Sequence, residues 1–180
     1  MKAYKHLFKY IMYFITVIVL VFLDQFTKYL SQIKLKNKAP FEVISDFIEL
    51  RYLENDGMAG GMLGGKIQLF TIFTIVLIIL VIALMIRIDV KMSMADNPRA
   101  LLSLQIVLVV LIAGAVGNLI DRVRLNYVID FIYFKVIDFP IFNVADCYVV
   151  ISTFVLLLMI MFFVKEDDWN LLLSCNKRSE

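Results

Sequence analysis

Histidine and cysteine are nearly absent from this sequence of 180 residues, which has one histidine, His6, and two cysteines, Cys147 and Cys175. With no second histidine and no Cys-x-x-Cys pair, a zinc site would have to use mainly carboxylate ligands, which suit zinc poorly. Two distant cysteines do not make a disulfide scaffold. No Gly-x-Ser-x-Gly motif is present, and no histidine lies near Ser31 or Ser45. We therefore expect no metal ion, no cofactor and no serine–histidine catalysis.

Charged residues are scarce as well. They make up 19% of the chain, and hydrophobic residues make up 62%, whereas a typical soluble domain is about a quarter charged and half apolar. The mean hydropathy is +0.86. The formal net charge of +2 gives no reason to expect a nucleic-acid partner. Several apolar runs approach the roughly 20 residues that cross a bilayer, so the sequence predicts an integral membrane protein.

Four apolar segments predict four transmembrane helices in a single membrane domain, residues 1–180. The first apolar run resembles a secretory signal, but it exceeds signal-peptide length and no small-x-small cleavage site follows it. The sequence thus indicates a mainly α, polytopic membrane protein. The expected helices cover residues 7–30, 67–88, 100–121 and 143–164. Small residues in the last turns of the third, Ala113, Gly114, Ala115 and Gly117, should let another helix approach closely.

Residues 41–65, between the first two helices, predict a small β-sheet on the membrane surface. Apolar and polar residues alternate in residues 47–54, which is typical of a strand. Asn55-Asp56-Gly57 is a turn signal, and residues 58–63 can return as a second strand. Pro40 breaks any helix before this region.

Two other stretches are neither long nor apolar enough to cross the membrane. Residues 123–141 form a half-apolar loop that ends near Pro140, and its aromatic residues suit the interfacial zone. Residues 165–180 form a short charged tail, in which Trp169 and three consecutive leucines suggest a surface helix.

The lysine and arginine count does not decide the orientation, because nine lie on each predicted side of the membrane. The first helix usually dominates, and Lys2, Lys5 and Lys9 flank its apolar run. We therefore expect both termini in the cytoplasm. On this topology Cys147 and Cys175 lie on opposite sides and cannot pair.

Polar residues gather at the outward ends of the third and fourth predicted helices, where burial would cost free energy. Helix capping explains some of them, since Asn143 suits the N-cap position and Asp146 the N3 position. Asn118 and Arg122 are i,i+4 neighbours that can bond each other. Asp121 lies at the unfavourable end of a helix dipole and needs a cation, such as Arg122. Asp130 interrupts an apolar run, where a carboxyl tends to keep its proton.

Two nearby carboxyl groups that share a proton are the arrangement of aspartic peptidases. The residues alone do not decide whether Asp121 or Asp130 partners Asp146. A serine–lysine pair using Lys28 stays open, and Asp24 with Lys28 either fixes the helix depth or supports a site. An ion or proton transporter is the main alternative function, followed by a noncatalytic scaffold. Nearly all the charge is expected at one membrane face, which disfavours transport.

Five short motifs, in this order, resemble those of the lipoprotein signal peptidase (signal peptidase II) family. They are Asp24-Gln25-x-x-Lys28, Asn55-x-Gly57-x-Ala59, Gly117-Asn118-Leu119-Ile120-Asp121-Arg122, Val128-Ile129-Asp130-Phe131 and Phe142-Asn143-Val144-Ala145-Asp146. Each motif is weak alone, but their order on four helices is specific.

The resemblance implies a four-helix inner-membrane aspartic peptidase with a small extracytoplasmic β-cradle. Such an enzyme removes signal peptides from diacylglyceryl-modified prolipoproteins, just before the lipid-carrying cysteine. Its catalytic pair falls on Asp130 and Asp146. We expect a monomer whose partners are lipidated prolipoproteins and membrane lipids. The residues expected to border or support the site are Asn55, Gly57, Asn118, Arg122, Asn143, Asp24, Lys28 and Asp121.

The sequence departs from the family pattern at three places. Gly60 and Gly61 stand where an aromatic residue usually follows the Asn-x-Gly motif. Cys147 stands where serine commonly follows the last aspartate, and we expect no role for it. The tail after Lys165 matches nothing in the family pattern.

Overall fold

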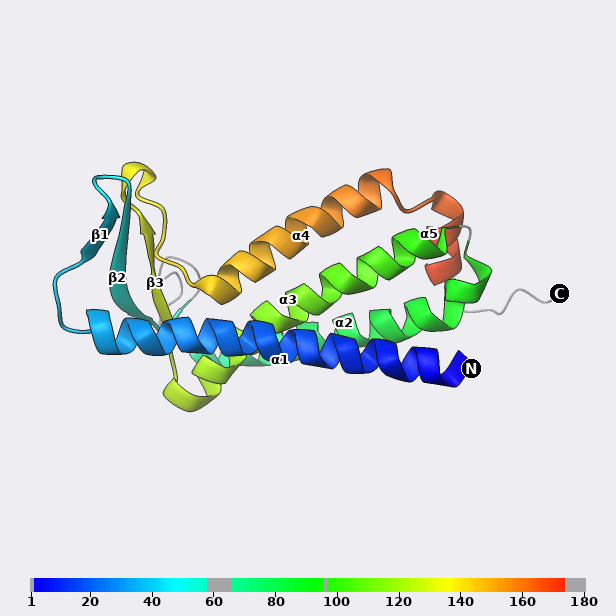
Figure 1. Cartoon of the computed structure of the whole chain (residues 1–180), viewed down its shortest axis with the longest axis horizontal. Helices are drawn as coiled ribbons and strands as arrows, with labels where there is room; N and C mark the ends of the chain where they lie inside the picture. The colour runs from blue at the N-terminus through cyan, green and yellow to red at the C-terminus, as the bar shows by residue number, and fades with distance from the viewer. Residues whose placement is uncertain (1, 58–65, 96, 174–180) are drawn as a thin grey trace.

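Four long helices dominate the computed structural model, which describes residues 2–57, 66–95 and 97–173 (Figure 1). Each helix is long and apolar enough to cross a membrane. The prediction of a mainly α, polytopic membrane protein is therefore confirmed. The helices are α1 (Lys2–Leu35), α2 (Ile67–Lys91), α3 (Pro98–Leu125) and α4 (Val144–Phe162).

The helix α1 is longer than predicted, because it continues to Leu35 through residues assigned to a loop. Its 34 residues span about 51 Å, against a hydrocarbon core of about 30 Å. Nothing breaks the helix before the loop that leads to Pro40. The last turns of α1 therefore extend beyond the apolar part of a membrane and contact the sheet.

A three-stranded antiparallel sheet lies at one end of the bundle (Figure 1). Its strands β1 (Phe41–Ile44) and β2 (Ile48–Asn55) follow α1, whereas β3 (Val128–Phe134) connects α3 to α4. The prediction of a small sheet is confirmed. Two of its strands come from the segment between the first two helices, and the third does not. The expected return strand, residues 58–63, lies outside the described residues.

The prediction that residues 123–141 form a loop is wrong, because they contain β3. The run Val-Ile-Asp-Phe-Ile-Tyr-Phe is rich in β-branched and aromatic residues, which favour strands. Its first four residues are all buried, so they show none of the alternation that marks a half-exposed strand. Its partner β2 is far away in the sequence, and its pairing is interrupted by a bulge between Leu50 and Leu53. The short 3-10 helix η3 (Lys135–Ile137) follows.

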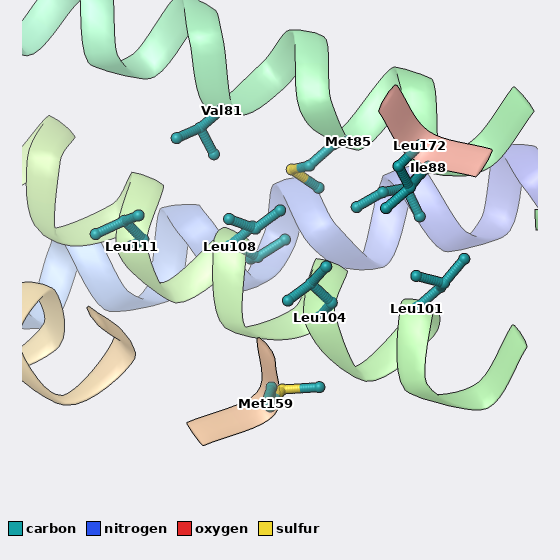
Figure 2. Close-up of a cluster of buried hydrophobic side chains, with 10 residues drawn as sticks. Val81, Met85, Ile88, Leu101, Leu104, Leu108, Leu111, Met159 and Leu172 are labelled. Atoms are coloured by element: carbon teal, nitrogen blue, oxygen red, sulfur yellow. The ribbon is translucent and has the colours of Figure 1, made fainter. Parts of the chain in front are cut away.

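The packed core lies between α2 and α3, where aliphatic side chains of the two helices meet (Figure 2). Most apolar side chains of α1, α2 and α4 that point away from this core are exposed, as expected for faces that lipid covers. The buried core residues are Val81, Met85, Ile88, Leu101, Leu104, Leu108, Val109, Leu111, Met159 and Leu172.

The C-terminal helix α5 (Glu166–Leu173) packs against the bundle instead of lying on its surface. Leu172 joins the core, and Asp168 is fully buried and accepts a hydrogen bond from the backbone N–H of Asn97 at 3.1 Å. The Arg87 side chain donates to the carbonyl of Leu172. A connection through η2 (Met92–Met94) places the α2–α3 turn beside α5.

A second polar cluster, which we call the terminal cluster, lies toward the end of the bundle that holds the N-terminus and α5. The Asp89 carboxylate accepts hydrogen bonds from Lys9, Tyr10 and, at 2.9 Å, Gln105. Tyr13 donates to Gln105 at 3.3 Å. The prediction that nearly all charge lies at one membrane face therefore missed this cluster.

Candidate functional site

The candidate site lies where the sheet meets the ends of three helices. The strand β3 carries Asp130, and the first turn of α4 carries Asp146. Asn118 and Asp121 project from the last turns of α3, and Lys28 from the last turns of α1. Four segments distant in sequence thus contribute to one polar cluster, which we call the site cluster.

Asp130 is buried and held at both of its carboxylate oxygens. Its Oδ1 accepts a hydrogen bond from Asn143 Nδ2 at 2.6 Å, and its Oδ2 accepts one from Asn55 Nδ2 at 2.7 Å. The Asn55 side chain is itself oriented, because the Gly57 backbone N–H donates to Asn55 Oδ1 at 3.0 Å. The turn after β2 therefore fixes one of the two amides that hold Asp130.

Asp146 takes part in a capping box at the start of α4, as predicted. The Asn143 N–H donates to Asp146 Oδ2 at 3.0 Å, and the Asp146 N–H donates to Asn143 Oδ1 at 3.0 Å. The capping bonds occupy one carboxylate oxygen only. The other, Oδ1, accepts a hydrogen bond from Asn118 Nδ2 at 2.7 Å.

Asn143 connects the two aspartates. It is fully buried, its side chain binds Asp130, and its backbone binds Asp146. Burial and, second, the negative charge of Asp146 together raise the pKa of Asp130 to about 7. The hydrogen bonds from Asn55 and Asn143 act in the opposite direction and lower this pKa. A carboxyl group in this environment holds a proton near neutral pH.

Lys28 is the cation that holds the rest of the site cluster together. Its Nζ lies 2.9 Å from Asp24 Oδ2 and 2.9 Å from Asp121 Oδ2, and it donates to Asn118 Oδ1 at 2.9 Å. The side chain is only 2% exposed. The Asp24–Lys28 pair is thus part of the network around the two aspartates and not an isolated surface pair.

The cation paired with Asp121 is Lys28, at 2.9 Å, and not the adjacent Arg122. The sequence predicted that Asp121 needs Arg122 or another cation. Asp121 Oδ2 also accepts a hydrogen bond at 3.2 Å from the backbone N–H of Ile129, the residue before Asp130. In this way Asp121 positions β3. Asp130, in contrast, shares Asn143 with Asp146. The geometry favours Asp130 over Asp121 as the partner of Asp146, a choice that the residues alone left open.

Arg122 is not in direct contact with the carboxylates of the site cluster, although it is near enough to Asp121, Asp130 and Asp146 to interact with their charges. Within the described residues it makes no ion pair with an aspartate, and its buried Nε has no hydrogen-bond partner. The bond to Asn118 that the i,i+4 spacing permits is not formed, because the Asn118 amide is engaged with Lys28, Asn143 and Asp146. The guanidinium side chain instead lines a hollow of about 340 Å³ beside the start of α2.

The sequence analysis overlooked Gln25, although the residue lies in the first motif. Its Nε2 donates to Asp121 Oδ1 at 2.9 Å, to the Gly117 carbonyl at 3.1 Å and to Asp24 Oδ2 at 3.2 Å. It therefore ties α1 to α3 beneath the site. Its place next to Asp24, between two site-supporting residues of one motif, was the signal that could have identified it.

Small residues on α3 allow the close helix packing that the sequence predicted. A Cβ atom on Gly117 would lie 2.6 Å from Asp24 Oδ2, and one on Gly114 would lie 2.6 Å from the Ala145 carbonyl oxygen. Asp24 Oδ1 also accepts a hydrogen bond from the Ala145 N–H at 2.9 Å. The two glycines thus let α1, α3 and the start of α4 meet, which brings Asp146 to the site.

Cys147 follows Asp146 in α4 and is a free thiol. Its backbone N–H donates to the Asn143 carbonyl at 3.3 Å as part of the helix, but within the described residues its thiol makes no hydrogen bond to the site cluster. Cys175 lies outside the described residues, so the expected separation of the two cysteines stays a prediction.

Comparison with known proteins agrees with the motifs. The family model described as signal peptidase (SPase) II matches residues 16–163. A lipoprotein signal peptidase of Caldanaerobacter subterraneus is 42% identical over 149 residues, covering 82% of this chain and 94% of the relative. The lipoprotein signal peptidase of Clostridium tetani is 39% identical over 159 residues, covering 86% and 94%.

Two solved structures of bacterial membrane enzymes, both obtained by the in meso method, have the same fold. One, at 2.3 Å resolution, has a TM-score of 0.69 and 32% identity and covers 94% of this chain and 93% of its own. The other, at 1.9 Å resolution, has a TM-score of 0.66 and 34% identity and covers 84% of this chain and 93% of its own. Sequence and fold therefore agree, and the chain belongs to the signal peptidase II family of bacterial membrane peptidases.

Proposed function

We propose that the protein is an aspartic endopeptidase that removes signal peptides from diacylglyceryl-modified prolipoproteins. Asp130 and Asp146 are its catalytic pair, and the bond it cleaves lies just before the lipidated cysteine. The substrate class follows from family membership and from the names of the relatives. The single observation that carries the choice of residues is that both carboxylates are held by Asn143, Asp130 by its side chain and Asp146 by its backbone.

The pair works with one proton between its two carboxyl groups. The ionised member takes a proton from water, and the water oxygen attacks the scissile carbonyl carbon. The protonated member donates to the carbonyl oxygen, which gives a tetrahedral intermediate. When the intermediate breaks down, the protonated aspartate gives its proton to the leaving amide nitrogen and the C–N bond breaks. A hydroxyl group of the intermediate returns one proton to the pair. The raised pKa of Asp130 supports this cycle, because the pair then keeps a proton near pH 7.

The amide side chains hold the pair in position for this reaction. Asn55, Asn118 and Asn143 donate to its oxygens and leave them in fixed orientations. Lys28, with Asp24 and Asp121, braces the helix ends that carry these amides. Because preorganised groups need little rearrangement during reaction, this bracing contributes to rate as well as to stability.

Arg122 and Gly57 border the path of the substrate. The Arg122 side chain is partly exposed, and its guanidinium can donate to a substrate carbonyl. Gly57 has no side chain, so the backbone beside Asn55 can approach the substrate closely. The lipidated substrate enters sideways from the bilayer, its acyl chains against the apolar helix faces. The site lies on the extracytoplasmic face, and both termini lie in the cytoplasm.

Substitution of either aspartate tests the proposal. We expect Asp130→Asn and Asp146→Asn each to lower kcat for a diacylglyceryl prolipoprotein by about 10²–10⁴-fold or more, since each removes an acid–base group. Asp138→Asn is the matched control, because Asp138 is exposed on the turn after β3 and its carboxylate accepts a hydrogen bond from Tyr133. Mass spectrometry of the products locates the cleaved bond. Wild-type turnover in either variant would contradict the assignment.

The same variants separate a peptidase from a transporter. Proteoliposomes that contain the wild-type protein should show no proton flux linked to Asp24 or Asp146. A robust flux that Asp146→Asn abolishes, without cleavage of the prolipoprotein, would favour the transporter instead.

A further inference from the structure

A cavity of about 550 Å³ lies between the C-terminal end of α1 and the sheet. Its volume is within the roughly 300–1,000 Å³ of ligand sites in proteins. None of the residues that hold the two aspartates lines it. Both α1 and the sheet contribute to its apolar wall. The apolar residues are Leu30, Leu35, Phe41, Leu50 and Phe131.

Two lysines, Lys34 and Lys38, also line this cavity, and both are exposed. Lys34 has no ion-pair partner within the described part of the chain, and Lys38 donates only to the Ile33 carbonyl, at 3.4 Å. The intervening Lys36 differs, because it forms an ion pair with Glu54 at 2.7 Å and is not part of the lining. The cavity thus combines an apolar interior with two positive charges that no carboxylate offsets.

Ser31 supplies an independent sign of a missing ligand. Its side chain lines the cavity and is 4% exposed, and its Oγ has no hydrogen-bond partner among the described residues. A buried hydroxyl without a partner costs about 1–3 kcal/mol. An oxygen-rich group in the cavity would satisfy it.

The position of the cavity places it at the membrane surface. The 34 residues of α1 exceed the roughly 20 that cross the hydrocarbon core, so its last turns reach the headgroup zone. Long lysine side chains near helix ends commonly extend toward that zone. A molecule with apolar chains below and a negative group above would meet the apolar wall and the lysines at once.

We propose that this cavity binds an anionic phospholipid of the surrounding membrane. One acyl chain fills the apolar interior, the phosphate lies between Lys34 and Lys38, and the Ser31 hydroxyl donates to an ester oxygen. The lipid carried by a prolipoprotein is a weaker candidate, because a diacylglyceryl group has no charge for the lysines. Phe131 and Asp130 are successive residues of β3, so their side chains leave the strand on opposite faces. The proposal does not depend on the peptidase activity.

Native mass spectrometry of the delipidated full-length protein tests the proposal. The protein is titrated with phosphatidylglycerol and with phosphatidylcholine of the same acyl chains. We expect preferential retention of phosphatidylglycerol, and about a tenfold loss of that retention in the double variant Lys34→Gln/Lys38→Gln. Lys36→Gln is the control for position, because it removes one positive charge from the same helix end outside the cavity; the single variants Lys34→Gln and Lys38→Gln match it in charge. Lys36→Gln should retain phosphatidylglycerol like the wild type.

Any one of four results would overturn the proposal. Equal retention of the two phospholipids by the wild type would remove the role of charge. An equal loss in Lys36→Gln would show general attraction to basic residues instead of a site. Displacement of phosphatidylglycerol by uncharged diacylglycerol at similar concentration would assign the cavity to the lipid of a substrate. Filling the cavity by Ser31→Leu should also lower retention; if it does not, the acyl chain lies elsewhere.

Discussion

The site cluster and the terminal cluster lie toward opposite ends of one bundle and differ in their balance of charge. In the site cluster, Lys28 is the one cation in ion-pair contact with carboxylates, among the described residues, and it contacts two of them. In the terminal cluster a single carboxylate, Asp89, is paired with Lys9. The site cluster contains the aspartates Asp24, Asp121, Asp130 and Asp146.

The difference agrees with a structural role for the terminal cluster and with the catalytic role proposed for the site cluster. Asp89 is paired with a lysine and bound by two further donors, Tyr10 and Gln105, so it is stable as a carboxylate. Asp130 and Asp146 receive hydrogen bonds from amides only, and neither has a cation in contact within the described residues. Excess negative charge in a buried site is relieved by binding a proton. A retained proton is what an acid catalyst needs.

The two clusters are also separated by an apolar segment of α3. Every residue from 106 to 117 is apolar or glycine, and Gln105 and Asn118 at its ends are therefore about 20 Å apart along the helix. Proton relays use closely spaced polar groups. The apolar segment supports the peptidase proposal over transport.

Replacing the lysine of the site cluster should have the largest effect. Lys28→Met leaves Asp24 and Asp121 buried without their cation, and we expect a loss of about 3–5 kcal/mol in unfolding free energy. Peptidase activity should fall with it, because Asn118 and β3 lose their support. Thermal unfolding of the purified protein in detergent measures the first effect, and prolipoprotein cleavage measures the second.

Lys9→Met is the matched substitution in the terminal cluster. Asp89 keeps its bonds from Tyr10 and Gln105, so the loss of stability should be smaller, and the folded fraction should cleave prolipoprotein at the wild-type rate. Equal destabilisation by the two variants, with equal loss of activity, would remove the distinction between the clusters.

Gln105→Leu should have an intermediate effect on stability and none on catalysis. Gln105 is fully buried, and its Nε2 donates to the Met85 carbonyl at 3.0 Å and to Asp89 at 2.9 Å. Losing these bonds should cost about 1–3 kcal/mol. The melting temperature should fall, while kcat measured well below it stays unchanged. A change in the pH dependence of kcat would show that the terminal cluster communicates with the site.

The sequence revealed the features that are local or compositional. Apolar length predicted four spans, the small residues at Gly114 and Gly117 predicted close helix contact, and spacing predicted the capping box of Asn143 and Asp146. Each depends on residues a few positions apart or on a single run. Local physics is enough to predict such features.

Other features depend on pairing between distant segments and were not predictable in this way. The strand β3 becomes a strand by pairing with β2, and it carries Asp130 to Asn143. Lys28 reaches Asp121 across 93 positions of the chain, so nothing near Asp121 pointed to its cation. The motif resemblance placed Asp130 in the catalytic pair before the geometry gave a reason. Gln105 was overlooked because one amide in an apolar helix has no visible partner nearby.

The pH dependence of cleavage should show the smallest and most specific difference. Because burial and the charge of Asp146 raise the pKa of Asp130 to about 7, kcat/KM should fall as the pH rises through about 7, where the pair loses its shared proton. The Asn55 amide favours the ionised form of Asp130. Removing it in Asn55→Leu should raise that pKa. The falling limb of the pH profile, where kcat/KM decreases, should then move to higher pH by roughly one unit.

Glu54→Gln is the control on the same strand. Glu54 pairs with Lys36 in an exposed ion pair, and we expect its removal to leave the falling limb where it is. A falling limb that moves to lower pH in Asn55→Leu would mean that Asn55 stabilises the protonated form of Asp130 and not the ionised form. A limb that does not move would separate the titrating group from Asp130. An upward shift in Asn55→Leu alone identifies Asp130, within the site cluster, as the carboxyl whose proton the reaction needs.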